Sequence, residues 1–184
     1  RLDELLATLP PVAEPALLDA GALDPYDAGI QIEMARLHIK AGDLGEARTA
    51  ARQAIRIDGE NAMAWNLAGR VAMGQSHWQR AEAAFRRAAQ LDPTNPMIRN
   101  NLGLLFVKAR RATAAVDALE TAVELFDDEV PHFVYNNLGL AYEMKSDLEN
   151  ARDAYEQALV ANPLYSRARL NLERALTAIA QLEQ

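Results

Sequence analysis

The stretch HFVYNNLGLAYEMKSDLENARDAYEQALVANPLY, residues 132–165, decides the fold of this chain. Its first half places Leu138 and Tyr142 four residues apart, and its second half places Ala151, Tyr155 and Ala158 at steps of four and three. Steps of three and four are the period of a helix with one apolar face. The polar residues 145–147 separate the two halves, so the stretch predicts two helices joined by a tight turn.

The same pattern recurs upstream at a fixed spacing. Ala47, Ala81 and Ala115 are 34 residues apart, and Ala151 follows 36 residues later, because two residues, Val130 and Pro131, are inserted before the last copy. Three residues able to cap a helix N-terminus keep the same spacing, and they are Asp27, Asn61 and Asn95. A fixed period of this length indicates a repeat array. We therefore expect four helix pairs, over 28–61, 62–95, 96–129 and 132–165.

The two ends of the chain depart from this pattern. Residues 166–184 continue the apolar phase with Leu172 and Leu176, and predict a C-terminal capping helix. Residues 1–27 carry four prolines and fit no repeat, so they are interpreted as an N-terminal extension, either a tether or a cap. A cap would pack on the first repeat through an apolar stripe, formed by Leu2, Leu5, Leu6 and Leu9.

The repeated residues resemble those of the tetratricopeptide repeat (TPR) family, whose pattern is Trp-x2-Leu-Gly-x2-Tyr, then Ala-x3-Phe, then Pro. The last copy matches best, the third has Leu119 in place of the aromatic residue, and the first has Gly59 in place of proline. The resemblance implies an all-α, right-handed superhelical solenoid whose first helices line a concave surface. It also implies that Trp65, Phe85 and the aromatic residues at equivalent positions serve packing.

The composition argues against several classes of function. The net charge is −7, which argues against a generally basic surface for nucleic acid. There are no cysteines, which excludes disulfides and thiolate chemistry. No apolar run approaches the ~18 residues that cross a membrane. The chain begins at Arg1, which we interpret as a trimmed or processed product, and both a cytoplasmic and a bacterial periplasmic or lipid-anchored location are compatible with the sequence.

The residues that usually carry enzyme chemistry are sparse and scattered. The three histidines fall at a packing position, a turn and a helix start, and none of the three serines stands in a nucleophile pattern. No glycine-rich phosphate loop is present. We therefore expect no enzyme activity, no metal and no cofactor.

Binding residues are sought at positions that the fold does not need. Counted from the start of each repeat, positions 2, 5, 6, 9, 12 and 13 form one stripe of the first helix. Asparagine recurs there although it is a mediocre helix former, at Asn66, Asn100, Asn101, Asn136, Asn137 and Asn171. An amide donates and accepts, which suits the backbone of an extended peptide. Asn101, Asn137 and Asn171 share position 6, and resemble the asparagine ladder of some TPR proteins; the alternative is that these amides bond to neighbouring helices or to water.

The stripe also carries charge and apolar side chains. Arg36, Lys40, Arg70, Lys108, Arg167 and Arg174 face only Glu33 and Glu143, and six minus two gives +4 on a chain of net charge −7. A locally basic groove favours an acidic partner. Met63, Met97 and Phe133 are expected to add apolar contacts. The TPR class that binds chaperones has lysine and asparagine at positions 5 and 9 of its first repeat, whereas this chain has Ile32 and Arg36, which argues against that ligand.

The sequence thus predicts a scaffold that binds a protein or peptide segment, with an acidic extended segment in its groove. Two other functions stay open. The repeats could be the regulatory or substrate-docking region of a larger enzyme, or a self-associating structural component of a bacterial envelope or appendage. RNA binding is a distant fourth, given the acidic balance and the few aromatic residues.

Overall fold

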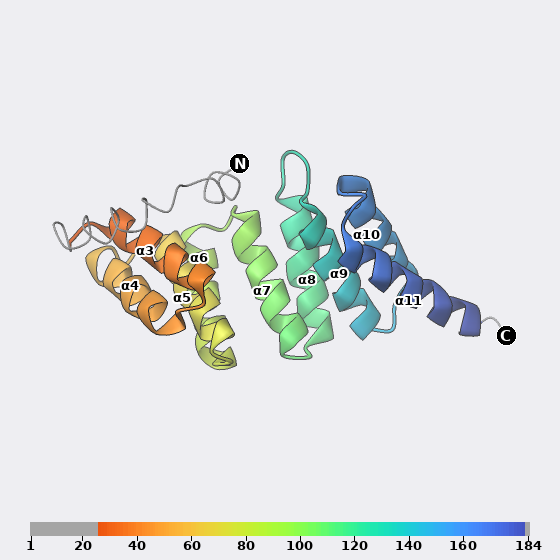
Figure 1. Ribbon diagram of the computed structural model, residues 1–184, viewed down its shortest axis with the longest axis horizontal. Coiled ribbons are helices and arrows are strands. Elements are labelled where there is room, and N and C mark those ends of the chain that lie inside the picture. The colour runs from red at the N-terminus through yellow and green to blue at the C-terminus, as the bar shows by residue number, and fades with distance from the viewer. Residues whose placement is uncertain (1–25, 183–184) are drawn as a thin grey trace. The chain divides into compact units, whose positions relative to one another are not determined.

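The computed structural model describes residues 26–182 of the chain, and every regular element in that range is an α-helix (Figure 1). The nine helices of the described residues agree with the number expected from the 34-residue period. The predicted N-terminal extension, residues 1–27, lies outside the described residues except for its last two positions, so its role as tether or cap stays a prediction.

The helices belong to two compact units, divided between Leu91 and Asp92. The described part of unit 1 contains α3 (Ala28–Ala41), α4 (Leu44–Ile57), α5 (Ala62–Gly74) and α6 (Trp78–Leu91). Unit 2 contains α7 (Pro96–Lys108), α8 (Ala112–Glu124), α9 (His132–Met144), α10 (Leu148–Ala161) and α11 (Ser166–Leu182). Within each unit, consecutive helices pack against one another, and α9 also contacts α7 and α11.

Side-chain caps start several of these helices. The carboxylate of Asp27 accepts the backbone N–H of Ile30, at 3.1 Å, at the start of α3. Asn61 accepts the N–H groups of Met63 and Ala64 at the start of α5. Asn95 does the same for α7, which opens with a proline. Each cap satisfies N–H groups that the helix itself leaves without a partner, which explains the 34-residue spacing of these three residues.

Small residues let the two helices of each pair approach closely. A Cβ atom added to Gly69 would lie 2.5 Å from the ring of Phe85, so α5 and α6 could not keep their separation with any larger residue there. Gly103 meets Leu119 in the same way in unit 2, and Gly139 meets Tyr155. Leu119 thus fills the space that an aromatic ring fills in the neighbouring pairs, which explains why the third copy tolerates this departure from the pattern.

The helix α11 has no glycine at the position of close helix approach. It packs on α10 and α9, and Ala168 and Ala175 are fully buried in those contacts. Glu173, which is exposed, stands where α5, α7 and α9 have glycine. A side chain of this size does not allow an approach as close as that of the Phe85 ring to Gly69, and the capping role of residues 166–184 stays a prediction.

Candidate functional site

Four asparagines of the predicted stripe form two hydrogen-bonded pairs in unit 2. The amide nitrogen of Asn137, on α9, donates to the amide oxygen of Asn100, on α7, at 3.0 Å. The amide nitrogen of Asn171, on α11, donates to the amide oxygen of Asn136, on α9, at 2.9 Å. The two bonds are equivalent, because each joins position 6 of one first helix to position 5 of the preceding one. Asparagine thus recurs on these helices because it links consecutive first helices.

Burial separates these amides into inner and outer members. Asn100 and Asn136 are only 3% and 4% exposed, so they are inner amides. Asn137 and Asn171 are half-buried, and we call them the outer amides. Each outer amide uses one N–H in the pair, and an asparagine amide has two N–H donors and an oxygen with two lone pairs. The outer amides therefore keep capacity for a ligand, while the inner amides hold them in place.

The remaining predicted asparagines are buried within their own helices' packing. Asn101 follows Asn100 on α7, is 9% exposed and already has an interaction partner. Asn66, on α5 of unit 1, is 5% exposed, and its amide nitrogen reaches the sulfur of Met63 at 3.9 Å. Asn66 therefore resembles the inner amides in burial. The expectation that all six asparagines contact a ligand stays a prediction, and the geometry favours the two outer amides.

The arginines of the stripe differ in whether they form an ion pair with a carboxylate of the stripe. In unit 1, Arg36 lies 3.3 Å from the carboxylate of Glu33 and also reaches the Met63 sulfur at 3.5 Å. In unit 2, Arg174 forms two bonds of 2.7 Å to Glu143. Arg70 and Arg167 are exposed, and Arg70 and Lys40 each have an interaction partner. Both stripe carboxylates thus pair with stripe arginines, and the other four charged residues of the stripe are all cationic: Lys40, Arg70, Lys108 and Arg167.

Glu143 is the centre of a three-residue network that joins α9, α10 and α11. Besides the two bonds from Arg174, its carboxylate accepts the hydroxyl of the fully buried Tyr155 at 2.8 Å. The guanidinium of Arg174 holds the pKa of Glu143 below its usual range, against the opposing effect of burial. Burial, with the hydrogen bond to Glu143, raises the pKa of Tyr155. The sequence showed the opposite charges at positions 12 and 9 of consecutive units, but not that they meet.

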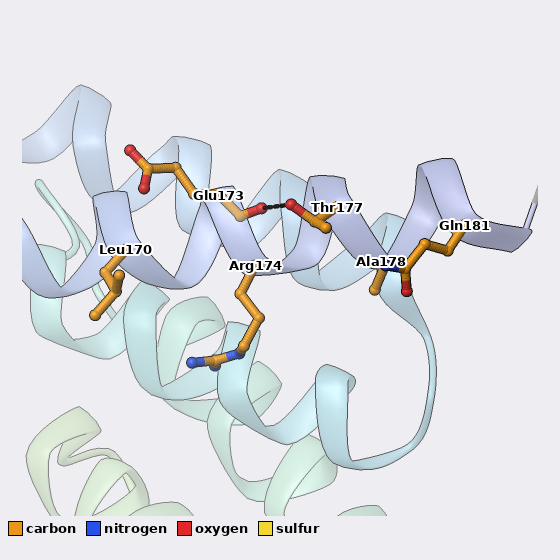
Figure 2. Close-up of a pocket in the computed structure, with 6 residues that line it drawn as sticks. All are labelled: Leu170, Glu173, Arg174, Thr177, Ala178 and Gln181. Carbon is orange, nitrogen blue, oxygen red and sulfur yellow. Dashed lines mark hydrogen bonds between the residues drawn. The ribbon is translucent and has the colours of Figure 1, made fainter.

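A shallow hollow of about 420 Å³ continues the stripe onto α11, and Figure 2 shows its lining. Its residues are Leu170, Glu173, Arg174, Thr177, Ala178 and Gln181. Leu170 is 64% exposed, so the hollow offers apolar surface to solvent. Arg174 points from α11 towards the side on which Leu170 and Ala178 lie, whereas Glu173 points the other way. Sequence reasoning placed Arg174 here but missed Leu170, Thr177 and Ala178, which occupy stripe positions 5, 12 and 13.

The predicted apolar contacts lie at the starts of first helices. Met97, at the start of α7, is 36% exposed, and Phe133, at the start of α9, is half-buried with its ring against His132. Met63 is half-buried beside Arg36 and Asn66. Ile32 is buried in the core of unit 1, so position 5 of the first repeat offers no polar group to a ligand. Met97 and Phe133 are thus accessible apolar side chains of unit 2, and their contact with a ligand stays a prediction.

The described residues contain neither a metal-binding cluster nor a membrane-spanning helix. Between positions 26 and 182, no group of three or more His, Asp or Glu side chains is arranged to hold a metal ion. Within the same range, no helix is both long and apolar enough to span a bilayer.

Comparison with known proteins identifies the repeat. The tetratricopeptide repeat family model matches residues 32–96 and 100–166. A peroxisomal targeting signal receptor of Candida albicans is 31% identical over 98 residues, covering 51% of this chain and 16% of the receptor. The BBSome complex member BBS4 of Mus musculus is 29% identical over 150 residues, covering 78% of this chain and 28% of that protein. The chain thus spans less than a third of the length of these curated relatives.

Solved structures give the same fold. The structure of pilF from Pseudomonas aeruginosa superposes with a TM-score of 0.78 at 22% identity, covering 84% of this chain and 69% of that one. YrrB, described as a TPR protein with an unusual peptide-binding site, superposes with a TM-score of 0.69 at 22% identity, covering 90% and 84%. Because the family model covers more than half of the chain and the helix pairs have the repeat's close-packed glycines, this chain belongs to the tetratricopeptide repeat family, whose repeats are scaffolds for protein–protein interaction.

Proposed function

We propose that this chain binds an extended, acidic peptide segment along its first helices, and that Asn137 and Asn171 hold the main chain of that segment. The observation that carries the proposal is the pairing of each outer amide with a buried inner amide. A side chain held in one orientation loses less conformational entropy when it binds a ligand, so preorganisation favours binding. The outer amides are also half-exposed, as a ligand contact requires.

The charge of the stripe favours an acidic partner. Once Arg36 and Arg174 are paired with stripe carboxylates, the remaining stripe charge is entirely positive. In unit 2 this charge comes from Lys108 and Arg167, which are exposed at the two ends of the helix stripe. Electrostatic attraction of this kind speeds association and selects for partner charge. Acidic side chains that flank the bound backbone would meet these cations.

A small number of contacts is enough for the expected affinity of the peptide. Each amide bond to a peptide contributes about 0.5–1.5 kcal/mol net. A few such bonds, with apolar contacts at Met97, Phe133 and the Leu170 hollow, are consistent with micromolar binding, or about 8 kcal/mol. Two comparisons point the same way, since one relative is named a targeting signal receptor and one structural neighbour is described by its peptide-binding site.

The test begins with a displayed library of random linear peptides selected on the intact chain. We expect the enriched peptides to be rich in Asp and Glu and to bind more weakly as salt screens exposed charges over about 8–10 Å. A chain that enriches no peptide, or enriches peptides without acidic residues, would contradict the proposal. The best synthetic peptide then serves as the probe for variants, measured by fluorescence anisotropy.

Two double variants separate binding from folding. Asn137→Ala/Asn171→Ala removes the outer amides, and Asn100→Ala/Asn136→Ala removes the inner amides, so both break the same two hydrogen bonds. The outer variant should lose about 5- to 150-fold in affinity, from two lost ligand bonds. The inner variant should lose much less, because the outer amides remain. Equal losses in both variants, in step with equal losses of stability, would show that the amides only hold the helices together.

A second function keeps its place as an alternative. The chain covers 16% and 28% of the two curated relatives, as expected for a docking region of a larger protein. The full reading frame around this chain decides whether a catalytic domain accompanies it.

A further inference from the structure

The second helices of the repeats carry charge of opposite sign in the two units. Position 25 of the repeat is Arg52 on α4 and Arg86 on α6, but Glu120 on α8 and Glu156 on α10. All four side chains are exposed. The charge at this equivalent, exposed position therefore changes sign between α6 and α8. Within unit 2, Glu120 also accepts the hydroxyl of Tyr142.

The remaining charges of these helices follow the same division. Helices α4 and α6 carry six arginines and two glutamates, so six minus two gives +4; the arginines are Arg48, Arg52, Arg56, Arg80, Arg86 and Arg87. Helices α8 and α10 carry one arginine and six acids, so one minus six gives −5; the acids are Asp117, Glu120, Glu124, Glu149, Asp153 and Glu156. We call the first set the basic face and the second set the acidic face.

Part of each face is already neutralised within its own unit. Arg86 pairs with Glu82 on the basic face, and Arg152 pairs with Glu149 and Asp153 on the acidic face. Across the described residues, Arg48, Arg52 and Arg56 of the basic face join no ion pair. The same holds for the side chains of Asp117 and Glu124, whereas Glu156 interacts electrostatically with Arg152 on its own helix.

These unneutralised charges repel one another in the single molecule. Arg48, Arg52 and Arg56 follow at steps of four along α4, and like charges at that spacing destabilise a helix. On α10, Glu156 is followed four residues later by Val160, which is 75% exposed. Each face would thus gain from an oppositely charged neighbour, and the acidic face also offers an apolar side chain to it.

We propose that the partner of each face is a second copy of this chain, with the basic face of one copy on the acidic face of the next. The same molecule supplies both signs, which a nucleic acid or an acidic protein would supply for one face only. Because the two faces differ, each contact joins unlike faces of two copies, either reciprocally in a closed pair or in succession along several copies. The contact uses second helices, so it is separate from the peptide site on the first helices.

The test uses a charge swap that leaves internal bonds intact. Variant one is Arg52→Glu/Arg56→Glu, and variant two is Asp117→Lys/Glu124→Lys, and none of these four side chains takes part in an ion pair within its unit. The matched control is Lys108→Glu/Lys145→Glu, which changes the net charge as variant one does but lies at the C-terminal ends of the first helices α7 and α9. Circular dichroism confirms that each variant is folded. Sedimentation velocity over a concentration series then measures association at low and at physiological salt.

The wild type should associate at low salt and dissociate as salt rises, because exposed charges are screened. Variant one and variant two should each associate at least about tenfold more weakly than the wild type, and the control should behave like the wild type. Each variant alone has two faces of like sign at the swapped positions, but a mixture of the two restores opposite charges. Mixing should therefore restore association.

Three outcomes overturn the proposal. A wild type that stays monomeric at low salt and high concentration has no such contact, and retardation of a DNA duplex by that monomer would assign the basic face to nucleic acid. A control that weakens association as much as variant one would show that net charge alone matters. A mixture of the two variants that fails to associate would show that the faces do not meet.

Discussion

The pair formed by Asn100 and Asn137 allows a quantitative test of how the first helices are linked. Replacing Asn137 with alanine removes the N–H that Asn100 accepts at 3.0 Å. The side-chain carbonyl of Asn100, a residue that is only 3% exposed, then lacks that donor. A buried acceptor left unsatisfied costs about 1–3 kcal/mol. Alanine is the better helix former and returns up to about 0.7 kcal/mol. The expected net loss of stability is therefore about 0.3–3 kcal/mol.

The double variant separates the hydrogen bond from the two side chains. Asn100→Ala/Asn137→Ala removes donor and acceptor together, so no buried carbonyl is left without its partner. Its loss of stability should be smaller than the sum of the two single losses by about 1 kcal/mol, the coupling expected of residues in contact. Gln157→Ala, at an exposed amide of α10, is the matched control and should change stability by less than about 0.5 kcal/mol.

Guanidinium chloride unfolding of the four proteins of the cycle measures these differences. Far-UV circular dichroism follows all helices, and the slope of free energy against denaturant must stay the same in each variant for the comparison to hold. Both tryptophans, Trp65 and Trp78, lie in unit 1, so their fluorescence reports on that unit while circular dichroism also includes unit 2. Losses that add within about 0.3–0.5 kcal/mol would refute the coupling and with it the preorganised outer amide.

Three further predictions test the fold and the network. Ala115→Leu places bulk at a fully buried contact, so the free energy of unfolding should fall by about 1–3 kcal/mol, and an unchanged thermal midpoint would contradict the close helix approach. Gly42→Ala should destabilise by about 1 kcal/mol because the φ of Gly42 is +85°, whereas Gly45→Ala, in the open first turn of α4, should stabilise by about 0.5–1 kcal/mol; thermal unfolding of the two variants compares them. Arg174 lowers the pKa of Glu143 in the folded state. The carboxylate therefore contributes stability at pH values above its pKa in the unfolded chain, and that contribution is lost as pH falls through its lower pKa in the folded state. Stability should therefore fall less steeply with acid in Glu143→Gln than in the wild type below about pH 5, and parallel curves would show that the network contributes nothing.

The sequence by itself determined the helices and their family. The period of 34 residues, the capping residues and the small residues at contact positions act locally or between neighbouring helices, so they leave a repeated trace in one chain. The close approach at Gly69 is an example, because only the absence of a side chain lets the ring of Phe85 lie there. The stripe of first-helix asparagines was predicted from the same trace, since a poor helix former that recurs in the middle of a helix needs a reason.

Only the tertiary structure decided what each stripe residue does. Asn100 and Asn137 are neighbouring positions of the period but differ in burial, which depends on how far α9 is rotated against α7. From the sequence, Glu143 and Arg174 are two separate charges. The packing of α11 on α9 brings the Arg174 guanidinium within 2.7 Å of the Glu143 carboxylate. Composition fixes how much charge a surface carries, but a charge meets its partner only through the packing of helices. For this reason, the sequence alone could not distinguish the stripe residues that pair with a stripe carboxylate from those that do not.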